Sequence, residues 1–275
     1  MNDAATPSGD PQSAALDAIR REIDGIDATL LSLCAERLQL ADRLTALKAP
    51  TPGLPIRPGR EVMLLRRLIA NARAPLEREL VVEIWRALIA ASLRRQRVID
   101  VAVGGARGDP SRLFDIARRH FGARTRIHQA GDSQTALQRV VDNPDTALAV
   151  TPWPAAPGVG AWWPALSERR FHHLHIIAGL PLLGAPHDEP EAAVFAAAPP
   201  EEAGGDVSLV LAFDPHHRLT RALSEIGFVG KEIARAEPRV LVRIEGFVQT
   251  DDPRVSALTR YGLDNPRVLG AYARL

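Results

Sequence analysis

A repeating pattern of apolar residues runs through the first fifty residues of the chain. Leucine and isoleucine recur at alternating steps of three and four, at Leu16, Ile19, Ile23, Ile26, Leu30, Leu33, Leu40, Leu44 and Leu47. This spacing predicts one continuous helix over 14–48, whose apolar seam packs against other helices. Arg37 occupies the missing seam position, and Lys48 follows the last member. Because a buried cation is costly unless an anion meets it, we expect the seam to open onto an anion site.

Two shorter helical patterns follow a segment rich in proline and glycine, 50–59. We predict helices over 60–72 and 75–97, so that residues 14–98 form an all-α three-helix domain after a disordered lead-in, 1–13. The first helix would be about 50 Å long, and three helices cannot cover such a seam within one protomer. We therefore expect an intertwined homodimer.

The pattern changes after residue 98. Predicted strands over 98–103, 125–129 and 147–150 alternate with predicted helices over 111–121 and 133–141, which favours a parallel sheet. Residues 99–205 are therefore predicted to be an α/β domain. Residues 206–275 read strand, helix, strand, strand, helix, strand, an α+β domain. The predicted fold class is thus multidomain, with α, α/β and α+β parts in that order.

The composition narrows the choice of partners and location. The net charge of +1 on 275 residues gives no field that would recruit nucleic acid or an anionic membrane. The single cysteine, Cys34, excludes a disulfide framework and a cysteine-based metal site. His172, His173 and His175 have no acidic or cysteine partner nearby, so we favour a packed or solvated cluster, with no metal and no cofactor. The absence of a signal sequence or an apolar span predicts a cytoplasmic protein.

Polar side chains stand on the apolar faces of the predicted helices. Arg37 and Lys48 lie eleven residues apart, so they share one face about 16 Å apart. Glu61 falls in line with the leucines of the second helix, and Ser92 and Gln96 are spaced i, i+4 on the third. Two cations, a carboxylate, a hydroxyl and an amide would suit a small dianion that carries a hydroxyl group.

Arg20 extends this constellation to a second chain. It precedes Arg37 by seventeen residues, or about 25 Å along a helix, so both cannot hold one small ligand within a protomer. In an antiparallel dimer, Arg20 could serve the site of the partner subunit. The alternative is a plain helical bundle whose cations extend to solvent.

Three sequence segments resemble the all-helical chorismate mutase family. They are AIRREIDGIDATLLSLCAERLQLADRLTALK, LPIRPGREVMLLRRLI and IWRALIAASLRRQ, which together cover 14–98. The resemblance implies that chorismate is the substrate and that prephenate is the product, which would make the chain an isomerase. It also implies a substrate site made from Arg20, Arg37, Lys48, Arg60, Glu61, Ser92 and Gln96.

The implied reaction is a unimolecular rearrangement that needs no nucleophile, metal or cofactor. The site has to hold a flexible dianion in a reactive chair and stabilise the charge that develops on the ether oxygen. By resemblance, Lys48 and Gln96 donate to that oxygen, while Arg37 and Arg20 of the partner subunit hold carboxylates, assisted by Ser92. Glu61 would accept from the ring hydroxyl, and Arg60 would order the adjacent loop.

The remainder of the chain resembles two further domains less fully. Residues 98–122 resemble the opening of a prephenate dehydratase domain, and the tail from 240 resembles part of an ACT regulatory domain. The segment 99–205 is short for a two-lobed dehydratase and lacks its Thr-Arg-Phe motif, so we expect a monofunctional mutase. Two alternatives are a bifunctional chorismate mutase/prephenate dehydratase and a non-catalytic protein that binds aromatic metabolites.

Overall fold

The computed structural model describes residues 11–47, 53–105, 110–154, 162–184 and 189–275. The chain divides into two compact units, residues 1–49 and 50–275, and each unit is described by itself.

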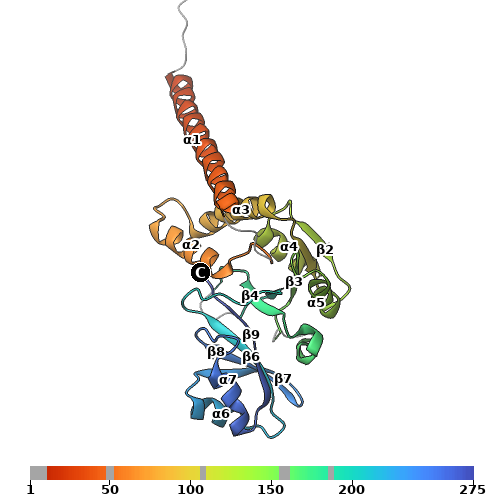
Figure 1. Ribbon diagram of the computed structural model, residues 1–275. Helices are drawn as coiled ribbons and strands as arrows, with labels where there is room; N and C mark the ends of the chain where they lie inside the picture. The colour runs from red at the N-terminus through yellow and green to blue at the C-terminus, as the bar shows by residue number, and fades with distance from the viewer. Residues whose placement is uncertain (1–10, 48–52, 106–109, 155–161, 185–188) are drawn as a thin grey trace, which may run out of the picture. The chain divides into compact units, whose positions relative to one another are not determined.

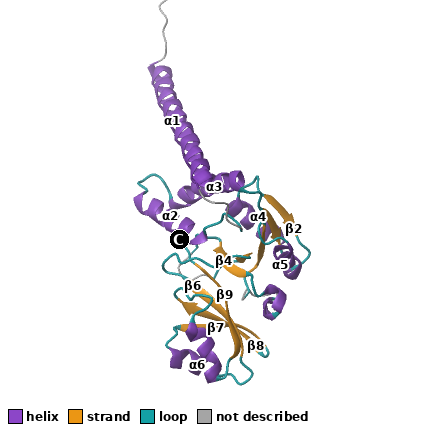
Figure 2. Cartoon of the chain, viewed as in Figure 1, coloured by secondary structure: helices purple, strands orange, loops and turns teal. Residues whose placement is uncertain are grey.

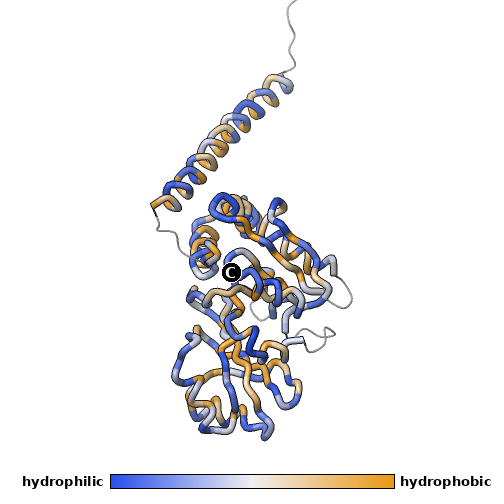
Figure 3. Tube along the Cα trace, turned by 45° about the vertical axis from the view of Figure 1, so that its right-hand side comes forward, coloured by the Kyte–Doolittle hydropathy of each residue, from blue (hydrophilic) through white to orange (hydrophobic). Residues whose placement is uncertain are grey.

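The first unit consists of helix α1, Pro11–Leu47, which is uninterrupted over 37 residues (Figure 1). The prediction of one continuous helix over 14–48 agrees with these bounds to within three residues. At 1.5 Å per residue the helix is about 55 Å long. Its apolar seam lies on the surface, with each of the nine seam residues between 46% and 84% exposed. Figure 3 shows apolar and polar positions alternating along this helix.

The second unit begins with helices α2, Pro58–Asn71, and α3, Arg78–Gln96. Helix α2 starts two residues before the predicted bound because Pro58 occupies the first turn, where a missing N–H is tolerated. The helices bury apolar faces that include Leu65 and Ile89, and these pack in the same core as residues 100–103 and 110–121, a strand and a helix described next. The helical segment and the sheet of this unit therefore share one hydrophobic core.

The parallel part of the sheet follows the prediction. Strands β1, Asp100–Val103, β2, Arg126–Gln129, and β3, Ala147–Pro152, pair in parallel with β1 in the centre. Helices α4, Pro110–Phe121, and α5, Ser133–Asp142, connect them. Two antiparallel strands, β4, His175–Leu180, and β5, Ala192–Ala196, extend this sheet and were not predicted as strands. Short 3-10 helices, Trp163–Ser167 and Arg169–Phe171, precede β4.

The last part of the chain has the predicted order of strands and helices. Figure 2 shows its strands together with helix α6. Strands β6, Val207–Phe213, β7, Gly230–Ala236, β8, Arg239–Glu245, and β9, Asp264–Tyr272, form an antiparallel ladder in the order β9-β6-β8-β7. Helices α6, Leu219–Ile226, and α7, Pro253–Ala257, pack with this ladder in one core. The βαββαβ arrangement and, with it, the predicted fold class are confirmed.

All nine strands belong to one sheet, in the order β2-β1-β3-β5-β4-β9-β6-β8-β7. The two halves join where β4 and β9 pair in parallel at Ile176 and Gly270. Gly270 has a φ of +148°, and a Cβ there would lie 2.1 Å from the carbonyl oxygen of Ile176. The sheet therefore crosses the boundary expected at 205/206, while the division into domains at 14, 99 and 206 stays a prediction.

Candidate active site

The start of helix α2 is fixed against the segment that precedes β6. Arg57 forms an ion pair with Glu201. A Cβ at Gly59 would lie 2.6 Å from the carbonyl oxygen of Glu202, so the helix backbone approaches that segment directly. Arg60 and Glu61, two of the predicted site residues, come next along this helix. Arg60 is exposed, while Glu61 turns inward.

A second tie holds the middle of α2. The guanidinium of Arg66 donates to the carbonyl oxygen of Arg274, at 2.7 and 3.2 Å, and to that of Ala203, at 2.8 Å. It also donates to the carbonyl oxygen of Gly204. Helix α2 is thus hydrogen-bonded to two backbone segments that are distant in the sequence. One segment directly precedes β6, and the other directly follows β9.

Glu61 meets a buried cation on the neighbouring helix. Its Oε2 forms an ion pair with the guanidinium of Arg86 on α3, whose side chain is only 4% exposed, while that of Glu61 is 12% exposed. Arg86 also donates twice to the carbonyl oxygen of His120, at 3.0 and 2.7 Å. His120 lies in the last turn of α4, where carbonyl groups lack helical partners and favour a cation. The contact therefore links α2, α3 and α4.

The imidazole of His120 lies half-buried beside this ion pair. Burial, with a smaller contribution from the positive charge of Arg86, lowers the pKa of His120 well below its ordinary value. The ring is therefore neutral near pH 7 and adds no second positive charge next to Arg86.

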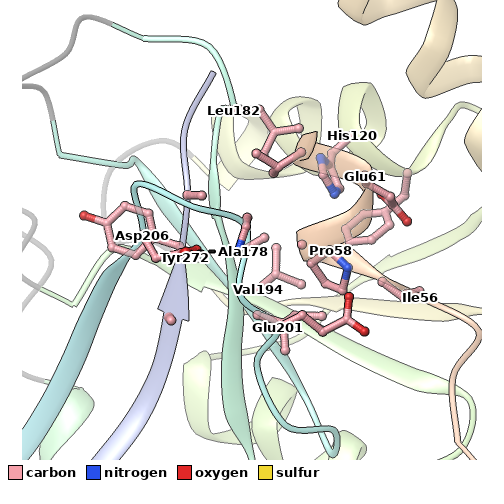
Figure 4. A pocket seen from close by; sticks show the side chains of 17 residues that line it. Ile56, Pro58, Glu61, His120, Ala178, Leu182, Val194, Glu201, Asp206 and Tyr272 are labelled. Atoms are coloured by element: carbon pink, nitrogen blue, oxygen red, sulfur yellow. Dashed lines mark hydrogen bonds between the residues drawn. The ribbon is translucent and has the colours of Figure 1, made fainter. Parts of the chain in front are cut away.

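A small, partly open cavity adjoins these side chains. It has a volume of about 20 Å³, and its lining includes Glu61, His120, Asp206 and Tyr272 (Figure 4). The carboxylate of Asp206 accepts from the backbone N–H of Ala203 at 2.9 Å, while its other oxygen is buried with no hydrogen-bond partner among the described residues. The volume suits one water-sized molecule and is too small for a ring-bearing dianion.

A wider cleft of about 330 Å³ lies between α3, α4 and residues 180–183, and Arg86 and His120 contribute to its wall. Its lining also includes the acidic side chains of Glu79, Glu83 and Asp115. None of the seven predicted site residues lines this cleft.

Helix α3 carries the predicted hydroxyl and amide. Ser92 is buried and donates to the carbonyl oxygen of Leu88 at 2.9 Å. The Gln96 amide donates to the carbonyl oxygen of Ser92 at 3.3 Å. The i, i+4 relation expected from the sequence thus brings Ser92 and Gln96 together on one helix.

The remaining predicted residues belong to the first unit. Arg20 is exposed on α1 and forms an ion pair with Asp17 at 3.1 Å. Arg37 lies half-buried on the same helix, seventeen residues further along. Lys48 lies outside the described residues. Arg20 and Arg37 are therefore about 25 Å apart along the α1 axis.

Sequence reasoning missed Arg86 and His120. Arg86 falls in an apolar row of α3, between Val82 and Ile89, and both of these neighbours are buried. A cation in an apolar row is the same signal that singled out Arg37, so Arg86 could have been found in this way. The carbonyl group of His120 carries no comparable sequence signal.

His172 and His173 lie just before strand β4, and His175 is its first residue. Across the described ranges, no group of three or more histidine, cysteine or acidic side chains is arranged to hold a metal ion. Burial, followed by the charges of Arg267 and His173, lowers the pKa of His175 to about 4. Of the helices in the described part of the chain, none has the length and apolar character to cross a membrane.

Comparison with known families finds a match for the helical segment. Residues 19–97 match the family model for chorismate mutase type II. This match confirms the resemblance inferred from the helical motifs of the sequence. The matched segment includes all of the seven predicted site residues.

Two similar proteins are named bifunctional chorismate mutase/prephenate dehydratase. The protein from Pseudomonas aeruginosa is 31% identical over 112 residues, which cover 39% of this chain and 30% of the relative. The protein from Neisseria gonorrhoeae is 36% identical over 103 residues, which cover 38% of this chain and 27% of the relative. The matches thus span less than a third of the length of each relative.

Solved structures show a distant likeness in fold. The prephenate dehydratase from Streptococcus mutans has a TM-score of 0.40 at 12% identity, and 64% of this chain matches 98% of that one. The prephenate dehydratase from Arthrobacter aurescens, solved with L-Phe, has a TM-score of 0.43 at 15% identity, and 64% of this chain matches 90% of that one. A structure described as GqqA, a quorum quenching acylase, has a TM-score of 0.44 at 14% identity, with 64% of this chain matching 95% of that one.

Proposed function

We propose that this chain is a chorismate mutase, an isomerase that converts chorismate into prephenate in aromatic amino-acid biosynthesis. The observation that carries the proposal is the family match over 19–97, which contains the complete set of predicted side chains. A cytoplasmic location is part of the same proposal.

The proposed reaction requires a site that binds and orients a dianion. Arg37 and Arg20 of the partner subunit would hold the two carboxylates, with Ser92 as an additional donor. Fixing the substrate in its reactive conformation removes much of the entropic part of the barrier. Lys48 and Gln96 would donate to the ether oxygen, where negative charge grows as the carbon–oxygen bond breaks.

The ring hydroxyl of the substrate would be recognised from helix α2. The Glu61 carboxylate is an acceptor, and one of its oxygens makes no hydrogen bond to a described residue. Arg60, which is exposed at the start of the same helix, would order the loop beside the substrate.

The active assembly would be a homodimer in which each site draws on two chains. The seam of α1, exposed along the whole described helix, offers apolar surface for a second copy. The 25 Å between Arg20 and Arg37 along α1 requires that one small ligand take them from different chains.

Incubation of the purified full chain with chorismate tests the activity. We expect chorismate to be consumed and prephenate to accumulate, and we expect an Arg37→Ala chain purified in the same way to be nearly inactive. Unchanged chorismate would refute the proposal. Formation of phenylpyruvate at an enzymatic rate would instead support the bifunctional alternative.

Mixing two inactive variants tests the shared site. Arg20→Ala and Arg37→Ala chains should each be nearly inactive alone, but in a mixed dimer one site carries neither change. Refolded together, they should regain a fraction of wild-type activity. Mixed dimers, detected by native mass spectrometry, that stay inactive would refute the shared site.

A further inference from the structure

We propose that Arg86 is a positioning residue for the mutase site. Helix α4 anchors its guanidinium, and the guanidinium in turn orients the carboxylate of Glu61. The inference rests on the proposed function, because it assigns a role to the contact that Glu61 makes. The observation behind it is the arrangement of the buried guanidinium of Arg86 between Glu61 and the carbonyl oxygen of His120.

Arg86 is itself held firmly. Its side chain is 4% exposed, and its Nε and a terminal nitrogen both donate to the carbonyl oxygen of His120, at 3.0 and 2.7 Å. The remaining terminal nitrogen contacts Glu61. A guanidinium with two anchors on one oxygen and one on a carboxylate has little freedom to rotate, so it fixes the direction of Glu61.

The contact leaves Glu61 able to accept one more hydrogen bond. Arg86 uses Oε2, and Oε1 makes no hydrogen bond to a described residue. The side chain of Glu61 keeps 12% of its surface exposed. Arg86 thus offsets the charge of a mostly buried carboxylate and leaves one oxygen for a hydroxyl donor.

The anchor lies outside the segment that matches the chorismate mutase family. His120 belongs to α4, Pro110–Phe121, whereas the match ends at residue 97. The last turn of α4 presents carbonyl groups and the negative end of the helix dipole, which favour a cation such as Arg86. The α/β part of this chain therefore contributes to the geometry of the mutase site.

Five variants of the full chain test the inference: Arg86→Gln, Arg86→Lys, Glu61→Gln, the double variant of Glu61→Gln with Arg86→Gln, and Arg67→Gln. Arg86→Gln should lower kcat/KM for chorismate by about 10- to 100-fold, since a hydrogen bond to a charged group contributes about 1.5–3 kcal/mol. Arg86→Lys should recover part of the loss. In a Glu61→Gln background, Arg86→Gln should lower kcat/KM less than 2-fold further, because the residue it positions is already altered. Arg67→Gln, which removes an exposed arginine of α2, is the matched control and should behave like wild type.

A chorismate analogue without the ring hydroxyl supplies a second readout. Glu61 has nothing to accept from this analogue, so Arg86→Gln and wild type should bind it equally, while their affinities for a hydroxyl-bearing analogue should differ. Thermal unfolding of each variant measures any loss of stability separately from the loss of activity. If Arg86→Gln is unstable, Arg86→Lys replaces it in the comparison of the two analogues.

The outcomes separate the two proposals. Losses that multiply in the double variant, or an equal loss of affinity for both analogues, would overturn the role of Arg86 while wild-type activity stands. A wild-type chain that leaves chorismate unchanged would overturn the proposed function and this inference together.

Discussion

Replacement of Asp214 by alanine should strongly destabilise the βαββαβ part of the chain. Asp214 follows β6 and is fully buried. One carboxylate oxygen accepts from the backbone N–H of Arg218 at 2.7 Å, and the other accepts from the N–H of Leu219 at 3.3 Å and from Arg235 at 3.0 Å. The same side chain thus caps the start of α6 and pairs with a cation on β7.

The magnitude follows from these two roles. Loss of a helix cap costs about 1 kcal/mol. Breaking a buried ion pair costs about 3–5 kcal/mol when the remaining charge has no other partner. Arg235 still donates to the Glu232 carboxylate at 2.6 Å, and this hydrogen bond is the main reason that the pKa of Arg235 is raised. We therefore expect a total loss of about 3 kcal/mol for Asp214→Ala, and about half of that for Asp214→Asn, which keeps the acceptor oxygen.

Urea unfolding of the full chain measures the loss, and hydrogen exchange shows where it occurs. Backbone amides in β6 and α6 should exchange faster in Asp214→Ala, while those in β1 and β3 should change less. Asp251→Ala, which removes an exposed carboxylate, is the control. Neutral surface substitutions change the free energy of unfolding by up to about 0.5 kcal/mol. If the free energies of unfolding of Asp214→Ala and the control differ by less than this, the energetic role given to Asp214 is wrong.

Three further predictions concern other parts of the chain. Gly270→Ala should lower the free energy of unfolding by about 1–3 kcal/mol through overpacking, because its Cβ would meet the backbone oxygen of Ile176; a urea midpoint equal to that of wild type would contradict this. Burial lowers the pKa of His175 to about 4. Between pH about 6.5 and about 4 the unfolded state therefore binds a proton that the folded state does not. The free energy of unfolding should decrease as the pH is lowered through this range, by up to about 1.4 kcal/mol per pH unit. His175→Gln should flatten that slope and the exposed His216→Gln should not, whereas equal slopes would exclude His175 as the cause. Lys48→Ala should lower kcat about 10²- to 10³-fold, and near-normal turnover would place the chemistry elsewhere.

Local patterns predicted much of the fold because many elements carry their own signal. The 3-4 repeat of α1 and the strand–helix alternation after residue 98 indicated the elements to within a few residues. Strand β5, Ala192–Ala196, is mostly alanine and buried on both faces, so it has no alternation that marks a strand. Its identity as a strand comes from its neighbours β3 and β4 in the sheet.

The candidate site could be predicted only as a set of residue types. The i, i+4 spacing of Ser92 and Gln96 lies within one helix, so the sequence contains it. The partner of Glu61 lies 25 residues away on another helix, and the acceptor that holds Arg86 is a backbone carbonyl 34 residues further on. Such contacts depend on how helices pack, which periodicity within one helix does not determine.

The tie between Arg66 and the carbonyl oxygen of Arg274 has a consequence for biosynthesis. The two residues are 208 positions apart, so at about 5–20 residues per second the ribosome adds Arg274 roughly 10–40 s after Arg66. Until Arg274 has been added, Arg66 has only the carbonyl oxygens of Ala203 and Gly204 as acceptors on this side of the chain, so helix α2 lacks one of its two attachments. We expect ribosome-bound chains to hold α2 loosely until strand β9 has emerged, so that α2 reaches its final structure only after residues synthesised much later.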